Sequence, residues 1–141
     1  MTVSGVVRET FKDGRVLLST PECTFEFRRP RFAALLVIIT GNDRGQFGTA
    51  ALDEIRLEIM RYKPLELFVD ARAATGASVS VSNEWTRFFS VNRENLKQVS
   101  VLGGSKVINL TMQIAQHLSR TGNLIHIHAD AESFEARVAA Q

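Results

Sequence analysis

The first third of the chain alternates between apolar and polar residues in short stretches, a pattern that predicts β-strands. Three such stretches run over 3–9, 15–19 and 24–28, with Asp13-Gly14 between the first two. An Asp-Gly pair favours a tight hairpin, because glycine accepts the positive φ angle that such a turn needs. The alternation in 24–28 indicates a strand with one face in solvent. We therefore expect the sheet to begin with antiparallel strands.

The pattern changes at Phe32, where a continuous apolar run extends to Ile39. Such a run predicts a strand that helices cover on both faces. Helices and strands then alternate: the predicted helices cover 49–62, 82–96, 105–120 and a short segment after Asp130, and the predicted strands cover 65–70, 98–102 and 124–128. Alternation of this kind is typical of α/β proteins with helical crossovers. The sequence thus predicts one α/β domain over 1–141, with a mostly parallel mixed sheet, N-terminal antiparallel strands and about four helices.

Composition restricts the function classes. The chain has 141 residues, is 45% hydrophobic and 23% charged, and has a formal net charge of +2. This net charge gives no general electrostatic case for nucleic-acid binding. The single cysteine, Cys23, excludes an intramolecular disulfide. The N-terminus lacks a signal-peptide pattern and no apolar run is long enough for a transmembrane segment, so a cytoplasmic location is expected.

Three basic or glycine-rich segments are candidates for anion binding. Arg28-Arg29-Pro30-Arg31 is suited to phosphate or acidic lipid headgroups, although a solvated turn between strands is the favoured interpretation. The glycines in 40–48 and 103–106 follow predicted strands, as in phosphate-binding loops, but their spacing matches no known fingerprint. Turn formation and helix capping account for them better. His126 and His128 alternate on a predicted strand and supply half a metal site at most.

No cofactor, metal site or complete catalytic constellation is evident, so the chain is not predicted to be an enzyme. In a parallel sheet, however, the loops that follow the strands meet at one edge, where α/β proteins place ligands. Six residues of these loops are therefore predicted to form a ligand or partner edge: Asp43, Arg44, Asp70, Arg72, Ser105 and Asp130.

The order of elements resembles that of the STAS and SpoIIAA-like domains. The strand that ends in Asp70 and the segments 84–89, 99–102 and 134–138 carry the resemblance. It implies a non-enzymatic regulatory module that contacts a protein partner, such as an anti-sigma factor or a kinase. Anti-sigma factor antagonists of this family are switched by phosphorylation of a serine at the start of the helix after this strand. The candidates here are Ser78, Ser80 and Ser82.

The resemblance is incomplete at the switch. The family motif Asp-Ser-Ser/Thr-Gly is absent from 77–83, so the favoured roles are an N-cap for Ser82 and loop positions for the other serines. A small-molecule, lipid or nucleotide binding module is the alternative, with Trp85, Phe88 and Phe89 as pocket walls, although core packing is the favoured role of these rings. The sequence encodes no visible dimer interface, and a homodimer is left open.

Overall fold

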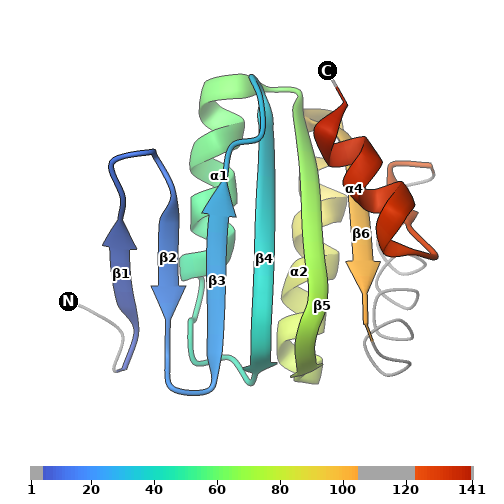
Figure 1. The fold of residues 1–141 in the computed structure, drawn as a ribbon. Coiled ribbons are helices and arrows are strands. Elements are labelled where there is room, and N and C mark those ends of the chain that lie inside the picture. Colours follow the sequence, from blue (N-terminus) through green and yellow to red (C-terminus); the bar gives the residue numbers. More distant parts are fainter. Residues whose placement is uncertain (1–4, 105–122, 141) are drawn as a thin grey trace.

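A seven-stranded mixed sheet forms the centre of the molecule in the computed structural model, which describes residues 5–104 and 123–140. The strands lie in chain order across the sheet (Figure 1). They are β1 (Val7–Thr10), β2 (Val16–Ser19), β3 (Cys23–Arg28), β4 (Ala34–Asp43), β5 (Leu65–Ala77), β6 (Leu96–Gly103) and β7 (Ile125–Ile127). Neighbouring strands from β1 to β4 pair antiparallel, and those from β4 to β7 pair parallel. The predicted fold class is confirmed.

Helices cover the two faces of the sheet unequally. Helices α1 (Ala50–Tyr62) and α2 (Val79–Asn92) lie behind the sheet in Figure 1, whereas α4 (Ala131–Ala139) lies in front. A 3-10 turn, η1 (Arg93–Asn95), follows α2. These are three of the four predicted helices, and the fourth, 105–120, falls outside the described residues. Within those residues, no helix is long and apolar enough to cross a membrane.

The main core lies between α1, α2 and the rear face of the sheet. Its centre includes Phe25, Val37, Ile55 and Phe88, all of them buried. A smaller core lies on the front face, where Phe134 of α4 packs against Phe68 with ring centroids 6.2 Å apart. Among the described helices, α4 is the one drawn in front of the sheet, and it does not reach over the front face of β1 to β3 (Figure 1).

Two helix predictions needed correction. The helical spacing of Leu52, Ile55, Ile59 and Met60 predicts one apolar stripe on α1; Leu52, Ile55 and Ile59 are buried, but the Met60 side chain is exposed. Helix α2 begins at Val79 rather than 82, because Ser78 caps it by accepting a hydrogen bond from the Val81 N–H (3.2 Å).

Two strand predictions were also wrong at their ends. The apolar run predicts a buried strand from Phe32, but strand β4 begins at Ala34 and the Phe32 ring is exposed. The sequence predicts that the next strand stops at Asp70, but β5 continues to Ala77 and pairs with the end of β4. Residues 71–77, which lie between the predicted strand 65–70 and the predicted helix 82–96, are therefore strand and not loop.

Candidate functional site

The predicted ligand edge is divided between two places. Strand β4 carries Asp43 at its end, in register with Ala77, whereas Asp70 pairs with Ile38 farther up the sheet. Ala77 lies seven residues farther along β5 than Asp70, which is about 23 Å at ~3.3 Å per residue. The extension of β5 thus keeps Asp43 and Arg44 away from Asp70 and Arg72. Ser105 lies outside the described residues.

Asp43 lies buried where the end of β4 meets the start of α2. Its carboxylate accepts a hydrogen bond from the Gly45 N–H (3.0 Å), and its carbonyl accepts one from the Ser78 N–H (2.9 Å). Burial raises the pKa of Asp43 above its ordinary value, the Gly45 hydrogen bond opposes this, and the nearby charge of Glu84 adds to it. Arg44 next to it is exposed and pairs with Glu22. The carboxylate of Asp43 therefore fixes the turn from the inside.

The first turn of α2 presents its side chains beside this carboxylate. Ser78 is half-buried and uses its hydroxyl as the helix cap, Val79 and Ser80 are exposed, and Ser82 is half-buried. The predicted capping role of Ser82 is wrong, because the helix begins earlier and Ser78 takes that role. Of the three serine candidates, only Ser80 is exposed.

Asp70 and Arg72 form an ion-pair network with α4. The Arg72 guanidinium donates to both carboxylate oxygens of Asp70 (3.0 and 2.7 Å) and to Glu135 (2.8 Å). These hydrogen bonds raise the pKa of Arg72. Asp130 caps α4 by accepting from the Ser133 N–H (2.7 Å). This half of the predicted edge consequently attaches α4 to the sheet.

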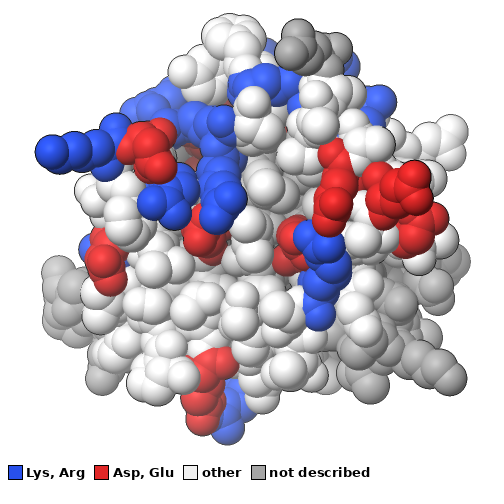
Figure 2. Space-filling view, in the orientation of Figure 1, with Lys and Arg blue, Asp and Glu red and all other residues white. Residues whose placement is uncertain are grey.

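An open groove of about 640 Å³ lies on the front face beside α4. Leu36 and Ile38 of β4 and Phe134 of α4 form its apolar part, and Arg28 and Arg72 lie at its rim. Figure 2 shows this face with its charged side chains grouped around uncharged ones. The volume falls in the ~300–1,000 Å³ range of small-molecule sites. Sequence patterns did not reveal the groove, since it depends on how much of the sheet α4 leaves open.

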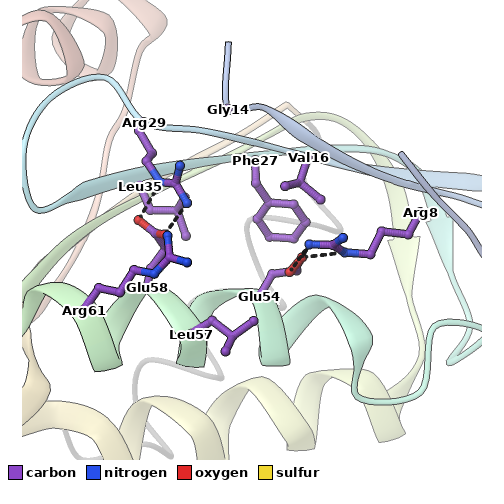
Figure 3. Close-up of a pocket in the computed structure, with 10 residues that line it drawn as sticks. All are labelled: Arg8, Gly14, Val16, Phe27, Arg29, Leu35, Glu54, Leu57, Glu58 and Arg61. Carbon is purple, nitrogen blue, oxygen red and sulfur yellow. Dashed lines mark hydrogen bonds and ion pairs between the residues drawn. The ribbon is translucent and has the colours of Figure 1, made fainter. Parts of the chain in front are cut away.

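A second, much smaller cavity of about 80 Å³ lies between α1 and the first three strands (Figure 3). Two ion pairs border it: Arg8 holds Glu54 (2.7 Å), and Arg29 holds Glu58 (2.6 Å). This volume is far below that of a metabolite site. The close-up shows the two pairs bridging the sheet and the helix, so their role is to attach α1.

The glycine-rich segments have structural explanations. A Cβ atom on Gly41 would lie 2.0 Å from the carbonyl oxygen of Glu22, and one on Gly104 would lie 2.3 Å from that of Arg72. Both glycines therefore permit close approach of two backbone segments. Gly41 also belongs to strand β4 and has a φ of 93°. These contacts favour the structural interpretation over nucleotide binding.

The histidines and the cysteine are not part of a reactive cluster in the described structure. His126 and His128 lie with ring centroids 4.4 Å apart, but no group of three metal-ligating side chains occurs among residues 5–104 and 123–140. His128 lies beyond the end of β7, with its Nδ1 2.9 Å from the Ser133 hydroxyl. Burial is the main cause of a lowered His128 pKa. Cys23 is buried, and this burial raises its pKa to about 12.

The three aromatic rings that could have formed pocket walls pack against one another and against the core. The Trp85 ring lies 6.4 Å from Phe88, 5.8 Å from Phe89 and 6.5 Å from Phe25, measured between centroids. Phe88 and Phe89 are buried in the main core. These contacts support the core role of the three rings.

Known proteins resemble this chain in fold and not in sequence. No family model matches the chain, and no curated protein is similar in sequence. An anti-sigma factor antagonist from Mycobacterium paratuberculosis aligns over 86% of this chain and 99% of its own, with a TM-score of 0.62 and 13% identity. The fold is SpoIIAA-like. An uncharacterised Shewanella loihica protein with a SpoIIAA-like fold aligns over 83% of this chain and 94% of its own, with a TM-score of 0.56 and 12% identity.

Proposed function

We propose that the protein is a non-enzymatic regulatory module that acts by binding a protein partner. The observation that carries the proposal is the likeness in fold, over nearly the whole of both chains, to an anti-sigma factor antagonist. The buried carboxylates Glu58, Glu66 and Asp70 are held in ion pairs that attach α1, α4 and the turns to the sheet, which is consistent with structural roles for these three acids. An anti-sigma factor or a kinase is the class of partner that the likeness suggests.

The start of α2 is the surface that we assign to the partner. The partner surface consists of Val79 and Ser80 with the neighbouring exposed side chains of Arg44 and Glu84. Val79 is 77% exposed and gives this surface an apolar side chain that a partner can bury. The Ser78 cap and the hydrogen bond from Ser78 N–H to the Asp43 carbonyl fix the turn, so a partner meets a preorganised surface.

The proposal does not depend on a phosphorylated serine. A phosphate on Ser80 would gain from the free N–H groups of the helix start. It would also lie one helical turn from Glu84 and near Asp43, whose pKa the Glu84 charge already raises. Like charges at i and i+4 on a helix are unfavourable. We therefore expect binding to rest on contact with the unmodified surface.

A pull-down from a lysate of the native host tests the proposal. Tagged wild type is compared with Val79→Asp and with Val91→Asp, a matched control that is 72% exposed at the opposite end of the same helix. Bound proteins are identified by mass spectrometry. We expect a specific partner that Val79→Asp loses at least tenfold and Val91→Asp retains. Equal retention by both variants would reject the partner surface, and the absence of any specific partner would reject the function.

A small-molecule binding module is a second candidate, favoured by the groove beside α4. Its apolar part and charged rim suit an amphipathic ligand of modest size. Native mass spectrometry of the purified protein is the test. A retained mass that disappears on Ile38→Glu, in the floor of the groove, would support this candidate. A clean mass of the protein alone, together with no shift in thermal stability across a metabolite library, would remove it.

A further inference from the structure

One end of the molecule collects the turns that precede the parallel strands. The β1–β2 turn, the β3–β4 turn and the ends of α1, α2 and α4 all lie there (Figure 1). We call this the basic end, because its turns carry most of the lysines and several arginines of the described chain. On the face drawn in Figure 2, the Lys and Arg side chains gather toward the same end, with isolated ones elsewhere.

Four cations at the basic end are exposed and make no ion pair with another described residue. They are Lys12, Lys63, Arg93 and Lys97. Lys63 and Lys97 lie at the starts of β5 and β6, which are neighbours in register at Leu65 and Leu96. Glu9 and Glu94 are exposed carboxylates in the same region that make no ion pair with another described residue. Four unpaired cations thus lie beside two unpaired acids.

The paired arginines of the basic end add to its positive field. In the Arg29–Glu58 pair, the arginine side chain is 41% exposed and the glutamate 6%. In the Arg137–Glu66 pair the corresponding values are 43% and 8%. Each carboxylate thus lies inside and each guanidinium faces outward. An approaching anion meets the positive side of both pairs first.

Exposed apolar side chains lie among these cations. Phe32 in the β3–β4 turn is 85% exposed, Met60 at the end of α1 is 76% exposed, and Val91 at the end of α2 is 72% exposed. They come from three separate elements and have one feature in common, their position at the basic end. Exposed apolar side chains beside cations are the combination with which peripheral proteins enter the headgroup region of a bilayer.

The turn that carries Phe32 is held firmly. Arg31 donates to Glu66 (2.5 Å) and to the carbonyl of Val138 (2.7 Å), which attaches the turn to β5 and α4. Ala33 has a φ of 57°, a conformation that a residue with a Cβ adopts only when its surroundings impose it. The Phe32 ring rests edge-on against Tyr62 at 5.1 Å. The ring is therefore presented to the outside by an ordered turn.

From this combination we propose that the basic end docks on the surface of an anionic lipid bilayer. The cations interact with lipid phosphates and carboxylates, and Phe32, Met60 and Val91 enter the headgroup region. The partner surface at the start of α2 lies at the opposite end, so this inference goes beyond the proposed function and does not rest on it. Nucleic acid is the other polyanion to consider. Two of the three exposed apolar side chains here, Met60 and Val91, have no ring that could stack on a base, which suits lipid better.

The expected contribution of each side chain to membrane affinity determines which variants are tested. A cation near an anionic membrane contributes about fivefold in affinity, from ~1 kcal/mol per charge. Removing Lys63 and Lys97 together should thus weaken binding about 25-fold. Replacing Phe32 by serine removes an aromatic ring whose insertion is worth roughly tenfold or more. Because these side chains are exposed, none of the variants should alter the fold.

Vesicle co-sedimentation tests the proposal with phosphatidylcholine vesicles and with vesicles that contain phosphatidylserine. We expect binding only to the anionic vesicles, and weaker binding as salt rises, since added salt screens surface charges. Lys63→Ala/Lys97→Ala and Phe32→Ser should each lose the affinity stated above. Arg44→Ala removes a cation from the opposite end and is the matched control, as is Val79→Ser for the exposed apolar residue. Circular dichroism checks that every variant is folded.

Three results would overturn the proposal. The first is no binding to anionic vesicles at low salt. The second is an equal loss for Arg44→Ala and for the lysine variant, which would indicate general charge attraction. The third is tighter binding to an RNA oligonucleotide than to vesicles through the same lysines, which would assign the surface to nucleic acid.

Discussion

Glu66 is the residue on which the attachment of α4 most depends. It is a buried carboxylate, 6% exposed, at the start of β5. It accepts hydrogen bonds from Arg31 of the β3–β4 turn (2.5 Å) and from Arg137 of α4 (3.0 Å). One side chain therefore links the sheet, the turn and the helix. Replacing Glu66 by glutamine keeps the shape and removes the charge, so it tests the contribution of this link.

The expected cost follows from the exposure of the three groups. Breaking a buried ion pair by removing one partner costs about 3–5 kcal/mol, and an exposed pair is worth about 0–1 kcal/mol. Glu66 is buried, but the side chains of Arg31 and Arg137 are 23% and 43% exposed, so water recovers part of their lost interaction. We expect Glu66→Gln to lower the free energy of unfolding by about 2–3 kcal/mol, between these limits.

Urea denaturation followed by circular dichroism measures this change, with Asp53→Asn as the control. Asp53 pairs with Arg56 on the surface of α1, and both side chains are about half exposed. The control should cost less than ~0.5 kcal/mol. The slope of the unfolding free energy with urea should stay constant, because the folded state loses no element. A Glu66→Gln variant that differs from the control by less than ~0.5 kcal/mol would refute the argument.

Three further variants or measurements follow from single contacts. Gly41→Ala should destabilise the domain by more than ~3 kcal/mol, because the added Cβ would lie 2.0 Å from the Glu22 carbonyl oxygen. Gly45→Ala should cost only ~1–2 kcal/mol, since Gly45 has a similar φ and open space around it. Equal loss of thermal stability in the two variants would contradict this. Cys23, with a pKa of about 12, should react with an aromatic disulfide reagent at pH 8 orders of magnitude more slowly in the folded protein than in urea, and equal rates would contradict its burial. Phe134→Ala should cost about 3–5 kcal/mol in urea denaturation because the ring fills the front core, and a loss below ~1 kcal/mol would show that α4 is not packed.

The order and types of the elements could be predicted because each rests on a local pattern. The Asp13-Gly14 turn forms the β1–β2 hairpin, and Gly14 has the positive φ of 90° that this role needs. Asp130 caps α4 as its position before an amphipathic segment indicated. Such signals act over a few residues, so the sequence alone contains them.

The ends of β4 and β5 could not be predicted because they depend on each other. The segment Ala71–Ala77 consists mostly of small residues with little preference for a strand, and it becomes a strand by pairing with residues 40–43. Phe32 shows the reverse error. Its apolar neighbours suggested burial, but the positive φ of Ala33 directs the chain out of the strand before Ala34.

The candidate surfaces could not be predicted from the sequence, because ion pairing between distant segments decides which charged side chains are free. The cluster Arg28-Arg29-Pro30-Arg31 reads as three free cations in the sequence, yet Arg29 and Arg31 each hold a buried glutamate from a distant segment. The cluster therefore stabilises the fold while its guanidinium groups remain partly exposed. The unpaired cations that we assign to lipid are scattered in the sequence and meet only at the end of the folded domain.

The two proposed surfaces are compatible because α2 runs from one end of the molecule to the other (Figure 1). Its start carries Val79 and Ser80, beside the buried Asp43, and its end carries Val91 and the unpaired Arg93. A domain that rests on a bilayer through its basic end therefore directs the start of α2 away from the membrane. A soluble partner could then reach Val79 while the protein is docked. Docking would concentrate the regulator on a surface without occupying the residues that bind its partner.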